Sequence, residues 1–106
     1  MTSQSVGLSL YEAARGMGVS FTQENQPTDK TVRANGLEFH YLDWGNPANP
    51  DVLMLHGVSQ QAHSWDFVAL ALSDRFHIMA LDQRGHGDTD WAPDGEYTTE
   101  AYVADL

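Results

Sequence analysis

The stretches LMLHGVSQQAHSW (residues 53–65) and HIMALDQRGHGDTD (residues 77–90) decide the fold. They include most or all of two apolar runs, Val52–Leu55 and His77–Leu81, of the kind that forms strands covered on both faces. Between the runs, Ser64–Leu72 carries apolar residues at helical spacing, and its first residue is placed to cap the helix. A strand, a helix and a strand in this order form a crossover connection, so the two strands are expected to run parallel.

The preceding segment predicts an antiparallel hairpin at one edge of the same sheet. Thr31–Ala34 and Leu37–Tyr41 flank Asn35-Gly36, a strong hairpin signal because both residues tolerate positive φ. Apolar and polar residues alternate along Leu37–Tyr41, as in a half-buried strand, and the loop Gly45–Pro50 ends it. The sequence therefore predicts an α/β architecture with a mixed sheet.

Both ends of the chain differ from this central pattern. Residues 1–30 read as a polar lead-in, for which both disorder and a short helix stay open, and the domain is expected to span residues 31–106. Near the other end, Thr98 or Thr99 is placed to cap a helix with an apolar stripe of Tyr102, Val103 and Leu106. No residue typical of a helix end follows, which favours a fragment of a longer protein.

Composition narrows the classes of partner. The 106 residues include 15 acidic and 5 basic side chains, for a net charge of −10, which repels nucleic acids and anionic membranes. The acidic run over residues 82–106 is expected to be a solvated face. There is no cysteine, no secretory leader pattern and no apolar stretch long enough to span a membrane, so we expect a cytoplasmic protein.

The two loops that follow the parallel strands are the best candidates for function, because ligands of open α/β sheets bind at the carboxyl ends of strands. Gly57 in the first loop allows a sharp turn that could leave N–H groups free for an oxyanion, but from Gly57 alone a merely flexible turn is the favoured explanation. In the second loop, Gly85-His86-Gly87 begins like a dinucleotide fingerprint, but Asp90 occupies the third glycine position. That interpretation therefore fails.

Together with EYTTEAYVADL (residues 96–106), these two loops resemble the α/β-hydrolase family, in its serine-nucleophile, esterase-like or lactonase-like branch. The resemblance implies the N-terminal part of an α/β-hydrolase sheet, a hairpin plus parallel strands with a βαβ crossover, which is incomplete here. It also implies a backbone oxyanion donor at Val58, with His56, Gly57 and Ser59 shaping the oxyanion loop. The second loop would be structural and includes Asp82, Arg84, Gly85, His86 and Gly87.

The sequence departs from the family by what it omits. It contains no Gly-x-Ser-x-Gly elbow and no histidine or acid at the family's catalytic positions, so the chain alone is expected to be inactive. Ser59 stands where epoxide hydrolases show a proline, which lowers the expectation of that chemistry. A non-catalytic binding module and one half of a split hydrolase remain open as alternatives.

The implied parent enzyme acts on small ester, lactone or related carbonyl substrates and uses no cofactor. The histidines lack the spacing of a paired metal-ligand motif, so no metal is expected and structural roles are favoured for His56, His63, His77 and His86. The resemblance also leaves the strand at Val52–Leu55 without its further neighbour. Its open, apolar edge predicts self-association of the chain.

Overall fold

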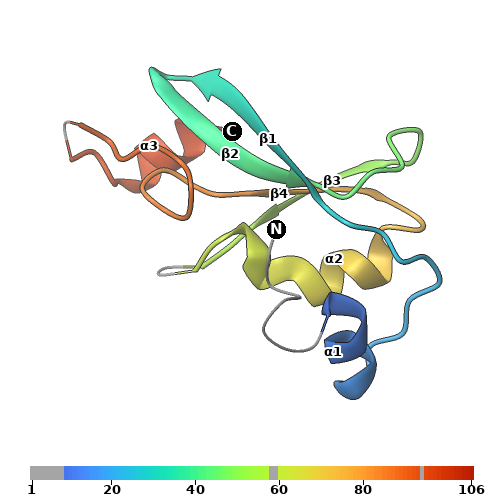
Figure 1. Cartoon of the computed structure of the whole chain (residues 1–106). Helices are drawn as coiled ribbons and strands as arrows, with labels where there is room; N and C mark the ends of the chain where they lie inside the picture. Colours follow the sequence, from blue (N-terminus) through green and yellow to red (C-terminus); the bar gives the residue numbers. More distant parts are fainter. Residues whose placement is uncertain (1–8, 58–59, 94) are drawn as a thin grey trace.

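The chain folds around one four-stranded mixed sheet, as the computed structural model of residues 9–57, 60–93 and 95–106 shows (Figure 1). The strand order is β1-β2-β4-β3. The strands are β1 Thr28–Ala34, β2 Leu37–Asp43, β3 Asp51–Leu55 and β4 His77–Leu81. The helices are α1 Leu10–Gly16, the 3₁₀ helix η2 Ala62–Trp65, α2 Asp66–Leu72 and α3 Thr99–Ala104.

The predicted hairpin is confirmed. β1 and β2 pair antiparallel, and Ala34 opposite Leu37 closes the ladder. Asn35 and Gly36 have φ values of 51° and 76°, the two positive values that a type I′ turn requires. The local sequence therefore set the turn and, through it, the register of the first two strands.

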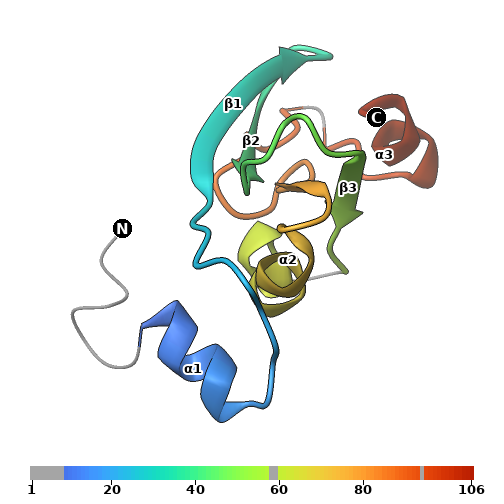
Figure 2. The same ribbon diagram turned by 90° about the vertical axis from the view of Figure 1, so that its right-hand side faces the viewer.

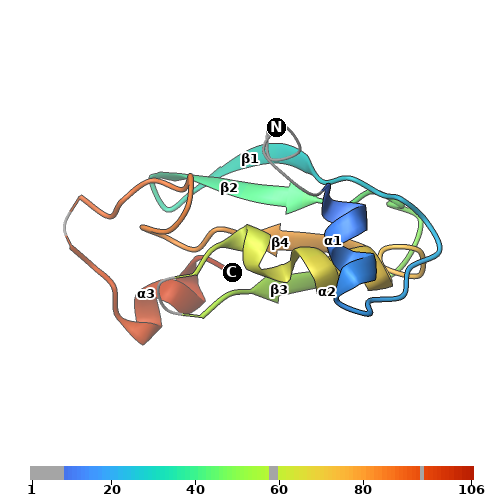
Figure 3. The ribbon, with the colours of Figure 1, turned by 60° about the horizontal axis from the view of Figure 1, so that its bottom comes forward.

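The predicted crossover is confirmed as well. β3 and β4 pair in parallel, from Asp51 opposite His77 to Leu55 opposite Leu81, with η2 and α2 between them in the chain. Figure 2 shows the sheet, α2 and α1 stacked in that order, so both helices cover one face. Figure 3 shows α3 apart from them, beyond the ends of β3 and β4.

Two apolar clusters hold the sheet, one on each face. The larger lies under α2 and α1 and consists of Ala14, Leu42, Trp44, Ala62, Ala69, Leu70, Ile78 and Ala80. The smaller lies on the opposite face and consists of Leu37, Phe39 and Leu81. Burial of such side chains contributes about 25 cal/mol per Å² of apolar area, which makes these clusters the main source of stability.

The first helix after β3 begins differently from the expectation. Ser64 was predicted to cap it, but α2 begins at Asp66 and Ser64 lies inside the preceding turn of 3₁₀ helix. The Ser64 hydroxyl accepts a hydrogen bond from the Gln61 N–H at 3.3 Å. The prediction was wrong because the Ala62 N–H is held by a distant carboxylate, Asp82, which places the start of the helical turn earlier.

The described part of the N-terminal segment contains a short helix, which the sequence left open. Helix α1 begins with a capping box between Ser9 and Glu12, and its Ala14 is fully buried. β1 begins at Thr28, three residues before the expected start. Burial of the small Ala14 side chain against α2 stabilises α1. The apolar periodicity of so short a segment indicates such a helix only weakly.

The C-terminal helix is confirmed, including its cap. The Thr98 hydroxyl accepts a hydrogen bond from the Ala101 N–H at 3.1 Å. The expected apolar stripe is largely uncovered, because Val103 and Leu106 are each 63% exposed. Within the described ranges, no helix has the length and apolar character needed to cross a bilayer.

Candidate active site

The turns after β3 and β4 meet at one rim of the sheet. The Gln83 N–H donates to His56 Nε2 at 3.0 Å, and the Gln83 side-chain amide donates to the His56 carbonyl oxygen at 2.8 Å. These two bonds join the loops that the sequence placed at neighbouring strand ends. The two loops therefore meet as the sequence predicts, whereas the functional roles of their residues stay predictions.

A cavity of about 230 Å³ opens between the two turns. It is lined by His56, Gly57, Gln83, His86 and Tyr102, the last of which belongs to α3. The rings of His56 and His86 lie with their centroids 4.7 Å apart. The cavity therefore combines residues from both strand ends and from the C-terminal helix.

The two histidines of this cavity are held by backbone groups. His56 Nε2 accepts from Gln83, so its Nδ1 carries the proton and donates to the Gly57 carbonyl oxygen at 2.8 Å. His86 Nδ1 pairs with the Arg84 carbonyl oxygen at 2.9 Å. These bonds fix the orientation of both rings, which supports the structural roles that the sequence favoured for them.

The loop after β3, where the sequence predicts the oxyanion donor, is only partly described. Val58 and Ser59 lie outside the described residues, so the assignment of Val58 as a backbone donor stays a prediction. The Gly57 N–H donates to the Gln60 side-chain oxygen at 3.1 Å and is not free in this structure. The same oxygen would lie 3.2 Å from a Cβ at Gly57, so the glycine accommodates this close side chain.

Asp82 is the residue on which both loops converge. It is 1% exposed, and its Oδ1 accepts a hydrogen bond from the Ala62 N–H at 2.7 Å. Its Oδ2 accepts from the Asp88 N–H at 3.0 Å and lies 2.6 Å from His40 Nδ1. Burial alone raises the pKa of Asp82, but these donors outweigh it and hold the pKa below its usual value.

The glycines of the second loop are required by close contacts. Gly87 has a φ of 51°, and a Cβ there would overlap the Asp82 carboxylate. Gly85 has a φ of 74°, and a Cβ there would lie 2.6 Å from the Tyr97 ring. The Gly-His-Gly pattern thus lets the loop fold tightly over a buried carboxylate.

Arg84 fastens α3 to the second loop. Its Nε and one terminal nitrogen bind the Asp105 carboxylate at 2.7 and 2.8 Å, and its other terminal nitrogen donates to the Glu96 carbonyl oxygen. The Asp105 side chain is 3% exposed. Burial raises the pKa of Asp105, but the hydrogen bonds from Arg84 and Asn35 lower it by more, so the net pKa is below its usual value.

The expectation of a solvated acidic face over residues 82–106 was therefore wrong for two of its members. Asp82 is buried and the side chain of Asp105 is 3% exposed, because each carboxylate accepts hydrogen bonds from other elements of the fold. Charge density along the chain does not reveal such partners. The other acids of the run that are described, such as Asp90 and Glu100, are exposed as predicted.

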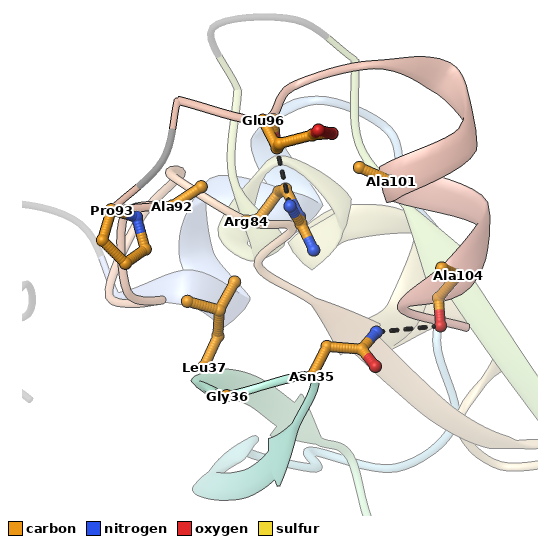
Figure 4. A pocket seen from close by; sticks show the side chains of 9 residues that line it. All are labelled: Asn35, Gly36, Leu37, Arg84, Ala92, Pro93, Glu96, Ala101 and Ala104. Atoms are coloured by element: carbon orange, nitrogen blue, oxygen red, sulfur yellow. Dashed lines mark hydrogen bonds between the residues drawn. The ribbon is translucent and has the colours of Figure 1, made fainter.

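A second cavity of about 380 Å³ lies between the hairpin turn and α3, away from the loop after β3 (Figure 4). It is lined by Asn35, Gly36, Leu37, Arg84, Ala92, Pro93, Glu96, Ala101 and Ala104. Its polar groups bind one another: Arg84 binds the Glu96 carbonyl oxygen, and Asn35 donates to the Ala104 carbonyl oxygen at 3.0 Å. We therefore place the candidate site at the smaller cavity.

His40 is the buried residue that sequence reasoning missed. The alternation along β2 predicted a polar, half-exposed position, but His40 is 6% exposed because its face of the strand is also covered. Its Nδ1 lies 2.6 Å from Asp82, and its Nε2 lies 2.7 Å from Asp29 on β1. A histidine among apolar strand residues was the available signal, although it does not identify either partner.

Three potential metal-ligand side chains lie close together, namely His40, Asp82 and Asp88, with ligand atoms within 4.8 Å of one another. Both ring nitrogens of His40 are already engaged by carboxylates. An ion would have to displace one of these bonds, so the cluster fits an internal hydrogen-bond network better than a metal centre. That the protein needs no metal or cofactor stays a prediction.

The ionisable network predicts a pH optimum for stability. Burial lowers the pKa of His40, but Asp82 and Asp29 outweigh it and the net pKa is raised; Asp51 and Asp43 likewise raise that of His77. A raised histidine pKa stabilises the fold below the unfolded value of 6.5, and this contribution is lost as pH rises through the folded value. Asp82 has the opposite pH dependence: its depressed pKa stabilises the fold above the unfolded value of 3.8, and this contribution is lost as pH falls through the folded value.

We therefore expect the urea midpoint of unfolding to be higher at pH 6 than at pH 8.5, and to fall again towards pH 3. The His77→Gln variant should show a smaller loss between pH 6 and pH 8.5 than the unsubstituted chain. A midpoint that rises steadily from pH 6 to pH 8.5 would contradict the assigned direction of the histidine shifts.

Comparisons with known proteins agree on one family. The profile of the α/β-hydrolase fold matches residues 50–106. An esterase of Mycobacterium tuberculosis is 37% identical over 91 residues, which make up 86% of this chain and 28% of that protein. Epoxide hydrolase A of the same organism is 39% identical over 62 residues, or 58% of this chain and 19% of that protein.

A solved structure shows the same arrangement. The thioesterase domain from the curacin biosynthetic pathway superposes with a TM-score of 0.71 at 29% identity, covering 76% of this chain and 30% of that domain. The chain thus spans less than a third of the length of each of these relatives. This chain has nearly the same sequence identity to the esterase as to the epoxide hydrolase, so identity alone does not favour either reaction.

Proposed function

Because the chain belongs to the α/β-hydrolase fold family and corresponds to the N-terminal portion of that fold, we propose that it forms the oxyanion side of a hydrolase active site. The substrates would be small esters, lactones or related carbonyl compounds. The meeting of the loops after β3 and β4 around the cavity at His56 carries this proposal. Ligands of open α/β sheets bind at such strand ends.

The chemistry we propose is acyl transfer through a serine. A serine on a Gly-x-Ser-x-Gly elbow would attack the carbonyl carbon, and a histidine held by an acid would accept the hydroxyl proton and then donate it to the leaving group. The developing oxyanion would be bound by the Val58 N–H and by the N–H of the residue after the serine. The 106 residues contain neither the elbow nor this histidine, so both have to come from further chain.

Epoxide opening is the second candidate, because an epoxide hydrolase is among the relatives. That family's loop has a proline where this chain has Ser59. Because of this difference, we favour ester or lactone hydrolysis over epoxide opening. A cytoplasmic location and the absence of nucleic-acid or membrane partners are part of the same proposal and follow from composition.

The test begins with the reading frame beyond Leu106. We expect a Gly-x-Ser-x-Gly within about thirty residues, after an apolar strand. In the protein that includes it, Val58→Pro removes the backbone donor and should lower kcat for a p-nitrophenyl ester by about 10²–10³-fold. KM should change little, because the oxyanion forms only after binding.

Val58→Ala is the matched control, because it keeps the N–H while removing the same side chain, and it should retain most of the activity. The 106-residue chain by itself is the blank and should show no turnover above buffer. Equal loss in both Val58 variants would refute the oxyanion role. Hydrolysis of epoxides in preference to esters would select the second candidate.

A further inference from the structure

We propose that His40 is a positioning residue that holds the two loops of the site in place through Asp82. His40 lies on β2, within the sheet, and lines neither of the two cavities described above. Its effect on the site is therefore indirect. That the loops serve catalysis rests on the proposed function, whereas the positioning itself rests on the contacts alone.

A continuous set of contacts runs from β1 to both loops. Asp29 Oδ1 lies 2.7 Å from His40 Nε2, and His40 Nδ1 lies 2.6 Å from Asp82 Oδ2. The Asp82 carboxylate then accepts the Ala62 N–H, at the end of the oxyanion loop, and the Asp88 N–H in the second loop. One carboxylate thus fixes both loops, and His40 fixes that carboxylate.

Burial makes His40 necessary to this arrangement. Asp82 is 1% exposed, so water cannot replace a donor that is removed. A buried carboxylate that loses its charged partner is left undersolvated, and its remaining donors have to move to compensate. The Ala62 and Asp88 N–H groups are those donors, and each belongs to one loop.

The protonation of His40 leads to a second expectation. A neutral imidazole carries one N–H and can serve only one of its two carboxylates. The Asp29 side chain is 73% exposed and can be hydrated, whereas Asp82 cannot, so the proton should stay on Nδ1. Asp88 lies within the same cluster and adds a further negative charge near His40. The pKa of His63 is raised chiefly by its hydrogen bond to Asp66 and further by Asp29 and Asp82, so His63 adds a positive charge when it is protonated.

His77 provides an internal control with the same chemistry. Its two ring nitrogens also contact two carboxylates, Asp51 at 2.7 Å and Asp43 at 2.9 Å. It lies at the opposite end of β4, where the strand begins, and it contacts neither loop of the site. Substitution of His77 therefore shows the effect of losing a histidine paired with two carboxylates, and substitution of His40 shows the additional effect on the two loops.

The experiment replaces His40 by two amides of different length. The Asn side-chain nitrogen approximates the position of Nδ1 and keeps a donor for Asp82, whereas the Gln nitrogen approximates Nε2 and keeps only the bond to Asp29. Hydrogen exchange of the 106-residue chain is followed by mass spectrometry in peptides that cover Ala62 and Asp88. His40→Gln should speed exchange there about tenfold, and His40→Asn less than about twofold.

His77→Gln should leave the same peptides unchanged. Equal acceleration in both His40 variants, or acceleration spread evenly over α1 and α2, would show a general structural role and overturn the proposal. Nitrogen-15 spectra of the unsubstituted chain test it without any variant: above its pKa, His40 should be the Nδ1–H tautomer, and an Nε2–H tautomer would overturn it. Neither measurement depends on hydrolysis. The positioning role of His40 can therefore be confirmed or refuted whether or not the proposed hydrolase function is correct.

Discussion

Replacement of Gly87 by alanine is expected to destabilise the chain by about 3 kcal/mol or more, enough to unfold much of it. The new Cβ would overlap the Asp82 carboxylate, and the residue would also hold a φ of 51° that disfavours any side chain. Asp82 cannot move aside, because it is buried and bonded to three donors. Urea unfolding followed by tryptophan fluorescence measures the loss.

Gly36→Ala is the matched control for backbone strain alone. Gly36 has a φ of 76°, and a Cβ there would meet nothing within 4 Å. Its replacement should therefore cost only about 1 kcal/mol. Equal midpoints for the two variants would mean that the contact with Asp82 does not restrict Gly87, and that the second loop is not packed against this carboxylate.

The isolated chain is expected to self-associate through β3, with a second copy of the chain as the partner. β3 is an edge strand of the described sheet. The His77 N–H donates to the Pro50 carbonyl oxygen, so by alternation the backbone groups of Asp51 and Leu53 point away from β4. Leu53 is also 49% exposed, and a long apolar edge with free N–H groups is a template for strand pairing.

Leu53→Lys should shift the chain towards the monomer, because a charge on an edge strand opposes pairing with another copy. The opposite edge supplies the control: Val32 on β1 is 50% exposed but stands among Asp29, Lys30 and Arg33, so Val32→Lys should change nothing. Light scattering after size-exclusion chromatography over a range of concentrations measures the mass. A monomeric unsubstituted chain at all concentrations would contradict the prediction.

Much of the fold follows from residues that are close in sequence. Asn35-Gly36 determined the hairpin, because the positive φ values that the turn needs are local properties of those two residues. The runs at β3 and β4 predicted a parallel pair, because a helical segment between two strands forms a crossover connection. The site loops were located for the same reason: each directly follows its strand.

Other features depend on which distant groups pack together. Ser64 does not cap α2, and α1 is ordered, because contacts with Asp82 and α2 override the weak local signals. The roles of Gly85 and Gly87 could be predicted only as tight turns. What they turn around, the Tyr97 ring and the Asp82 carboxylate, comes from the folded structure.

The sequence by itself determined the hairpin, the parallel direction of β3 and β4 and the rim at which a site can form, since turn preferences and apolar periodicity act between neighbouring residues. Only the tertiary structure decided that His40 and Asp82, 42 residues apart, form a buried pair that joins both loops. Burial of a charge is stable only where donors converge on it from several elements. That convergence is a property of the assembled fold, and no single segment of the chain records it.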